Sequence, residues 1–208
     1  MEKTIKEHWE AVFTTKAANE VSWYQKQPKT SIDLIQACKV SKEAKIIDIG
    51  GGDSYLIDSL LDLGYTNLYL LDISEAAIER AKQRLGDRAK EVTFIVSDSL
   101  HFQSEEKFDI WHDRASFHFF TETKDIEQYK LNVIANTSQN AHLIIGTFSE
   151  EGPQKCSGLP ITQYSVEKME AVFGSDFELE NCLTEDHKTP FDTVQNFIFC
   201  TYKKNNDD

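Results

Sequence analysis

One short stretch of the sequence combines an acid within an apolar run with three glycines directly after it. The apolar run 45–49 contains Asp48, and Gly50, Gly51 and Gly52 follow at once, before a helical pattern begins. Such a run predicts a buried strand that turns into a helix. Glycine allows a tight turn and lets a ligand approach the backbone, while the helix N-terminus offers free N–H groups. An acid at Asp48 favours a positively charged group in that ligand.

A second acid ends the next apolar run. Asp72 closes the stretch 67–72, and an acid at such a strand end accepts hydrogen bonds from both hydroxyls of a ribose. A dinucleotide loop requires G-x-G-x-x-G, whereas Tyr55 stands where that pattern needs a small residue. A ribose joined to a positively charged group describes S-adenosylmethionine. We therefore predict S-adenosyl-L-methionine, and not a nicotinamide nucleotide, as the cofactor.

The order and spacing of these two motifs resemble those of a known family. Asp48-x-Gly50-x-Gly52 followed by the run 71–74 is similar to the class I S-adenosylmethionine-dependent methyltransferases. Ser54 stands where many members have a third glycine, and serine is small enough to take that place. The resemblance spans most of the chain. It implies a seven-stranded sheet with one reversed strand, and methyl transfer as the activity.

Apolar strands and helical patterns alternate along the chain. The predicted strands are 46–49, 67–72, 92–96, 108–112, 141–147, 176–184 and 193–202, and the predicted helices are 53–63, 74–85, 124–137 and 165–173. Ser74 and Ser165 are the expected N-caps. The alternation predicts an α/β fold with a doubly wound, mostly parallel sheet. The last two strands have no helix between them and should pair antiparallel, which gives seven strands with one reversed.

The whole of residues 1–204 is predicted to form one methyltransferase domain. Its parts are an N-terminal helical lid at 1–40, a cofactor-binding core at 45–147 and an acceptor side at 148–204, followed by a disordered tail at 205–208. By composition, disorder is expected from Lys203 onward, so Lys203 and Lys204 resemble the tail although they lie within the domain boundary. An amphipathic helix is expected at 2–20, and Ser31 should cap a helix at 32–38. Trp23 and Tyr24 lie between these helices. They either fold over the ligand as a lid, which we favour, or pack in the core.

Composition limits the class of function. The 208 residues are 40% hydrophobic with a net charge of -13, which fits a globular domain and argues against a nucleic-acid substrate. No apolar run is long enough for a membrane span, and the first residues lack the apolar core of a signal peptide. The four cysteines are far apart, so we expect free thiols in a cytoplasmic protein. No metal site is predicted, because His112, His118 and His187 show no ligand spacing.

The ligand should lie beyond the carboxyl ends of the parallel strands. This rule selects the segments 50–54, 72–74, 97–100, 113–120, 147–163 and 185–192. Asp98 is either a solvated acid or, as in the family, an acceptor for the adenine amino group, and we favour the second reading. Ile73 and Leu100 either sandwich the adenine or belong to the core. The predicted cofactor-binding residues are Asp48, Gly50, Gly51, Gly52, Asp72, Ile73, Asp98, Ser99, Asp113, Trp23 and Tyr24.

The predicted catalytic residues are Arg114, His118 and His187. Arg114 either binds a carboxylate of the acceptor as a two-pronged fork or pairs with Asp113 or another local acid. Methyl transfer is mainly a matter of positioning, and a base is needed only if the nucleophile arrives protonated. The two histidines have a suitable pKa range for such a base, although His187 also fits a plain surface turn.

Two further segments are expected to enclose the acceptor. The loop 148–163 is long for a compact domain, and we predict that it forms a wall of the pocket, with Cys156 as a contact for a soft acceptor. An aromatic wall for a cation or a flat apolar acceptor is available from Phe117, Phe119, Phe120, Trp23 and Tyr24. For Phe119 and Phe120 we expect core packing instead.

Three functions fit these observations. The first is a methyltransferase with a small-molecule acceptor, favoured by the single compact domain and its lid. The second is a protein lysine methyltransferase that acts on a basic partner, because the run 113–117 partly matches the corresponding loop of lysine methyltransferases of translation elongation factors and the chain is acidic. The third is a module that binds the cofactor without catalysis. We predict the first.

Overall fold

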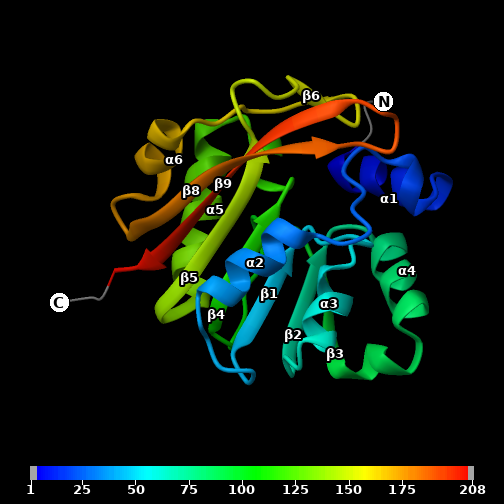
Figure 1. Ribbon diagram of the computed structural model, residues 1–208, viewed down its shortest axis with the longest axis horizontal. Helices are drawn as coiled ribbons and strands as arrows, with labels where there is room; N and C mark the ends of the chain where they lie inside the picture. Colours follow the sequence, from blue (N-terminus) through cyan, green and yellow to red (C-terminus); the bar gives the residue numbers. More distant parts are fainter. Residues whose placement is uncertain (1–3, 206–208) are drawn as a thin grey trace.

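The computed structural model describes residues 4–205 and shows one large sheet with helices on both faces (Figure 1). Its strands are β1 (Lys45–Ile49), β2 (Asn67–Asp72), β3 (Val92–Val96), β4 (Phe108–Arg114), β5 (Thr137–Phe148), β8 (Phe177–Lys188) and β9 (Val194–Lys204). They lie in the order β3-β2-β1-β4-β5-β9-β8, and β9 is antiparallel to both neighbours. The predicted doubly wound sheet of seven strands with one reversed strand is confirmed.

The parallel strands β1, β2 and β4 bring their carboxyl ends to one edge. Ile49, at the end of β1, lies beside Leu71 of β2 and Asp113 of β4. The strand order reverses between β1 and β4, and a reversal of this kind opens a crevice where ligands bind. The edge that carries the glycines is therefore the edge at which a site is expected.

The helices form two layers, one on each face of the sheet. They are α2 (Lys29–Ala37), α3 (Leu56–Asp62) and α4 (Glu75–Leu85) on one face, and α5 (Thr123–Asn136) and α6 (Val166–Phe173) on the other. Ile35, Ile57 and Ile78 of the first layer pack in one core cluster, whereas Val133 and Met169 of the second pack in another. Figure 1 shows α2 and α3 in front of the sheet and α5 and α6 behind it.

Three elements close the carboxyl edge. Helix α1 (Ile5–Thr15) lies beside α4 at this edge, and a short 3₁₀ turn, η1 (Ala18–Glu20), follows it (Figure 1). A small hairpin of β6 (Lys155–Cys156) and β7 (Leu159–Pro160) projects from the segment after β5. The predicted long loop 148–163 thus contains regular structure. Because Ser157 and Gly158 both have positive φ, the hairpin turns in two residues.

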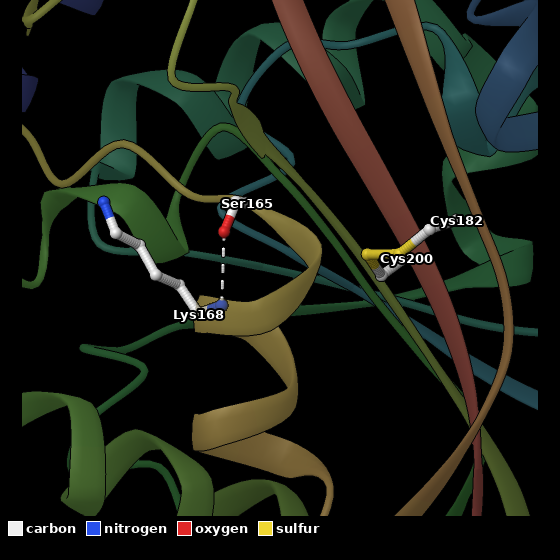
Figure 2. Close-up of a disulfide and its surroundings, with 4 residues drawn as sticks. All are labelled: Ser165, Lys168, Cys182 and Cys200. Atoms are coloured by element: carbon white, nitrogen blue, oxygen red, sulfur yellow. Dashed lines mark hydrogen bonds between the residues drawn. A yellow bond between two sulfur atoms is a disulfide. The ribbon is translucent and has the colours of Figure 1, made fainter.

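Helix N-termini match the sequence prediction at two of three places. Ser74 Oγ accepts from the Ala77 N–H at 3.2 Å, and Ser165 Oγ accepts from the Lys168 N–H at 3.4 Å (Figure 2). The prediction that Ser31 caps a helix is wrong. Helix α2 begins at Lys29 after Pro28, because proline is favourable where the first N–H groups lack partners.

The C-terminal hairpin corrects three other expectations. Cys182 and Cys200 lie opposite each other in β8 and β9 and form a disulfide (Figure 2), so these two are not free thiols. Cross-strand register brought them together, and sequence spacing gave no sign of it. Lys203 and Lys204 belong to β9 and not to a tail, and the Asn205 N–H donates to Asp176 O at 3.0 Å. The rest of the predicted tail, 206–208, lies outside the described residues, as do 1–3 of the predicted first helix.

Within residues 4–205, no helix is long and apolar enough to cross a membrane. Within the same range, no group of three or more His, Cys, Asp or Glu side chains is arranged to hold a metal ion.

Candidate functional site

The glycine loop after β1 is packed so tightly that side chains would not fit. Gly50 and Gly52 have φ of +61° and +55°, a left-handed conformation that favours glycine. A Cβ at Gly51 would lie 2.4 Å from Asp48 Oδ2, and a Cβ at Gly52 would lie 2.8 Å from Phe13 Cζ. The three glycines therefore bring bare backbone against Asp48 and against the N-terminal helix.

Two adjoining cavities open at this edge. The first is bounded by the ends of β2, β3 and β4 and by α1 and β6, and the second by the glycine loop, α2 and the segment after η1. Four residues, Phe13, Trp23, Gly50 and Arg114, line both cavities. A ligand that spans the two cavities must pass directly over Gly50.

The first cavity contains the acids that end β2 and follow β3. Asp72 is 5% exposed and accepts from the Ser74 N–H at 2.8 Å and from the Gly52 backbone. Burial raises the pKa of Asp72 to about 7, and these two hydrogen bonds oppose the rise. Ile73, Asp98 and Ser99 line the same cavity, whereas Leu100 packs in the core.

The second cavity contains a buried chain of three polar side chains. Asp48 Oδ1 lies 2.7 Å from His112 Nδ1, and His112 Nε2 lies 2.9 Å from Ser31 Oγ. Asp48 and His112 face each other because they are register partners on β1 and β4. All three residues are at most 3% exposed, and Asp48 Oδ2 is buried without a hydrogen-bond partner. A free carboxylate oxygen at this place can accept from a positively charged ligand.

Helix α1 supplies an aromatic cover and is anchored by one acid. Glu10 accepts from Ser74 Oγ at 2.7 Å and from the Ala76 N–H at 3.1 Å, at the N-terminus of α4. A carboxylate is favourable there because the first N–H groups of a helix lack internal partners. The ring of Trp9 then lies 5.7 Å from that of Trp23 and 5.0 Å from that of Phe119.

The segment that carries Trp23 and Tyr24 is held at two carbonyl groups. Arg114 Nη1 donates to Trp23 O at 3.0 Å, and His187 Nε2 donates to Ser22 O at 2.7 Å. Trp23 lines both cavities, and Tyr24 lines the second. The segment predicted as a lid thus lies over both cavities.

Asp113, predicted as a cofactor-binding residue, does not line either cavity. Its side chain is fully buried and accepts from the N–H groups of Ser116 and Phe117 and from Tyr129 Oη, at 3.0, 3.1 and 2.7 Å. Burial raises the pKa of Asp113 to about 6. The acid therefore holds the turn after β4 in place and lacks an oxygen for a ligand.

The two histidines predicted as bases also line neither cavity. His118 is fully buried between the rings of Phe119 and Phe148, and burial lowers its pKa to about 3. His187 lies within β8, which runs to Lys188, so it is not on the predicted turn at 185–192. Burial lowers the pKa of His187, and its Nε2 is engaged by Ser22 O. Neither geometry supports the predicted role as a base.

Cys156 borders the first cavity from the β6 strand. Its side chain is 4% exposed, and burial raises the pKa of the thiol to about 12, so it is uncharged at neutral pH. The neighbouring Ser157 Oγ lies 3.3 Å from His8 Nε2 of α1. The hairpin and α1 thus meet beside the first cavity, and the role of this loop as a wall of the acceptor pocket stays a prediction.

Several cavity residues were not predicted from the sequence. Trp9 and Phe13 lay in an ordinary amphipathic pattern, and only their place at the carboxyl edge reveals them. Phe119 and Phe120 pack against the core clusters as expected, and they also line the first cavity. One cavity residue, His112, could have been recognised from the sequence, because a polar residue inside an apolar strand needs a buried hydrogen-bond partner.

The family model described as "Methyltransferase domain" matches residues 40–195. Among curated proteins, the eEF1A lysine and N-terminal methyltransferase of Mus musculus is 30% identical over 99 residues. That match covers 47% of this chain and 14% of the length of the mouse protein. The chain therefore spans only a small part of this relative.

Solved structures of the same fold cover nearly the whole chain. One, described as "Conversion of a Disulfide Bond into a Thioacetal Group during Echinomycin Biosynthesis", has a TM-score of 0.79 and 19% identity over 97% of this chain and 93% of its own. Another is the 1,6-didemethyltoxoflavin-N1-methyltransferase of Burkholderia thailandensis with 1,6-didemethyltoxoflavin and S-adenosylhomocysteine bound. Its TM-score is 0.68 at 17% identity, and the match covers 94% of this chain and 81% of that one.

Proposed function

The chain belongs to the family of methyltransferase domains, and from this premise we propose that it transfers the methyl group of S-adenosylmethionine to a small-molecule acceptor. The observation that carries the proposal is the pair of adjoining cavities at the strand-order reversal. The first cavity contains Asp72, a strand-end acid that can accept hydrogen bonds from ribose hydroxyls, and the second contains the unpartnered oxygen of Asp48. The backbone of Gly50 lines both cavities.

The residues present fit this cofactor. Asp72 would hold the two ribose hydroxyls, Asp98 and Ile73 the adenine, and Asp48 Oδ2 the ammonium of the methionine part. Because the glycines carry no side chains, a cofactor can approach the backbone of the loop closely. When bound, it supplies an activated methyl group on a positively charged sulfur.

The protein's own contribution is positioning and the exclusion of water. Trp9, Trp23 and Phe119 form an apolar wall across the first cavity, and Cys156 borders it as an uncharged thiol. Holding two reactants in line in a dry cavity is worth several orders of magnitude in rate. His112 is engaged on both ring nitrogens, so it holds Asp48 in place and is not free to take a proton from an acceptor.

Two observations favour a protein acceptor as the second candidate. The mouse relative bears the name of a lysine methyltransferase, and the net charge of -13 would attract a basic partner. A small molecule is preferred because residues of α1, the segment at Trp23 and Cys156 of β6 border the first cavity, so that an acceptor can be held within it.

Calorimetry tests the cofactor part of the proposal. The protein is titrated with S-adenosylhomocysteine and, as a control, with a nicotinamide dinucleotide of similar size. We expect saturable binding of the first in the micromolar range or tighter and no binding of the second. Equal binding of both ligands, or of neither, would reject the proposed function.

A further inference from the structure

Arg114 differs from every other arginine in the sequence. The other three are paired with aspartates near the surface, Arg80 with Asp53, Arg84 with Asp58 and Arg88 with Asp62, at 3.2, 2.8 and 2.9 Å. Arg114 lines both cavities and forms no ion pair with any residue in the described range 4–205. Glu185 has the largest electrostatic effect on Arg114, and its Oε2 is also buried without a partner, but the two side chains lie too far apart for an ion pair.

The unpaired part of Arg114 is one complete edge of the guanidinium. Nη1 donates to Trp23 O, but Nε and Nη2 are buried and have no partner. These two N–H groups point in parallel and match the two oxygens of a carboxylate. The ring of Phe197 lies 4.6 Å from the guanidinium carbon and fixes the plane of the group.

An unpaired guanidinium in this environment is unfavourable. Burial lowers the pKa of Arg114 to about 10, so the group is still charged at neutral pH. A buried charge without a partner destabilises a fold, and buried donors without acceptors add to that cost. An anion that binds at this edge would remove both penalties.

The surroundings place this edge on the acceptor side. The charged or titratable groups that act on Arg114 are, in order of effect, Glu185 of β8, Cys156 of β6 and Asp48. The first two belong to the segment after β5, and Asp48 belongs to β1. Arg114 borders the first cavity together with Trp23 and Cys156.

We propose that Arg114 binds a carboxylate of the methyl acceptor, and that the acceptor is a small organic acid with an apolar body. The apolar body would lie against the wall formed by Trp9, Trp23 and Phe119. This inference rests on the proposed function and names its substrate class. It also disfavours a lysine acceptor, because a guanidinium in the cavity repels an ammonium.

Ligand pairs that differ only in charge test this inference. The protein saturated with S-adenosylhomocysteine is titrated with benzoate, phenylacetate and indole-3-acetate, and with the primary amide of each acid. We expect at least one carboxylate to bind ten or more times as tightly as its amide. Arg114→Met should abolish this preference and change the affinity for S-adenosylhomocysteine less than threefold, whereas the surface control Arg88→Met should change neither.

Two further variants separate the alternatives. Arg114→Lys keeps the charge but loses the paired N–H edge, so it should reduce the preference for a carboxylate over its amide several-fold. This variant replaces Arg114→Met if the methionine variant fails to fold. Glu185→Gln should leave the preference intact. A preference that is absent from the wild-type protein and appears only in Glu185→Gln would mean that Glu185 occupies Arg114, and would overturn the inference.

Other results would also overturn it. No preference for any of the three carboxylates would remove the proposed acceptor class. A loss of about 100-fold in S-adenosylhomocysteine affinity in Arg114→Met would assign the arginine to the carboxylate of the cofactor. A wild-type protein that does not bind S-adenosylhomocysteine at all would instead reject the proposed function, which is a distinct result.

Discussion

At the scale of single residues, Asp72 gives the site a dependence on pH. Burial raises the pKa of Asp72 from 3.8 to about 7, so the ligand-free protein holds a proton there at pH 5 to 6. Ribose hydroxyls donate to the ionised carboxylate, and binding must therefore release that proton. The affinity for S-adenosylhomocysteine should rise about tenfold from pH 5.5 to pH 7.5 and then level off.

Calorimetry in buffers of different ionisation enthalpy would measure the proton release directly. The sign is fixed, because the bound state has the lower pKa and binding strengthens as pH rises through about 7. Asp72→Asn should bind more weakly and lose this pH dependence. An affinity that is constant over this range in the wild-type protein would contradict the assignment of Asp72.

His112 is expected to act through Asp48. His112→Ala removes the donor to Asp48 Oδ1 and leaves two buried oxygens without a partner, with an expected loss of about 1–3 kcal/mol in unfolding free energy. The affinity for S-adenosylhomocysteine should fall about tenfold, because the carboxylate is no longer held in one orientation. Denaturant unfolding and calorimetry measure the two effects. His112→Asn, which keeps a donor, should recover part of both, and a stable alanine variant with unchanged affinity would reject the role.

The positions of the acids follow from the sequence more directly than the surroundings of the histidines, for a physical reason. Asp72 and Asp98 follow strands, and the sheet edge fixes where a strand-end residue lies. The ring direction of His118 and His187 depends on packing against Phe148 and on a backbone carbonyl of a distant segment. Sequence periodicity contains no information on such contacts.

At the scale of elements, helix α1 should control access to both ligands. Glu10→Ala removes the contacts with Ser74 Oγ and the Ala76 N–H and should loosen α1 over the first cavity. We expect the affinity for S-adenosylhomocysteine to fall about fivefold to tenfold, and hydrogen exchange at 5–15 to quicken. Glu79→Ala on the exposed side of α4 serves as the control. Unchanged exchange in the Glu10 variant would show that α1 is held by its aromatic rings alone.

The sequence predicted the order and type of most elements but not their ends. Strand β8 extends to Lys188, and the turn that follows is fixed by the Thr189 side chain, which accepts from the N–H groups of Phe191 and Thr193. The alternating polar residues of β8 concealed this extension, because one of its faces is solvated. The pairing of Cys182 with Cys200 was missed because it depends on the register between β8 and β9, which the spacing of cysteines does not reveal.

At the scale of the whole molecule, long-range charge and local charge point to different acceptors. The net charge of -13 attracts basic partners in solution, but the fields of exposed charges are screened within about 10 Å at ordinary ionic strength. Arg114 acts inside the first cavity, where screening is weak. Under the proposal, the local charge selects the acceptor, and we expect a small acid to be bound in preference to a basic protein.

Transfer of labelled methyl groups tests the central claim most directly. The protein is incubated with S-adenosylmethionine labelled in its methyl group and with an extract of source cells, separated into small molecules and proteins. We predict that the label enters the small-molecule fraction, and that Asp72→Ala reduces transfer on the order of 100-fold at limiting cofactor. Label found only in the protein fraction, or equal transfer by the Asp72 variant, would contradict the account.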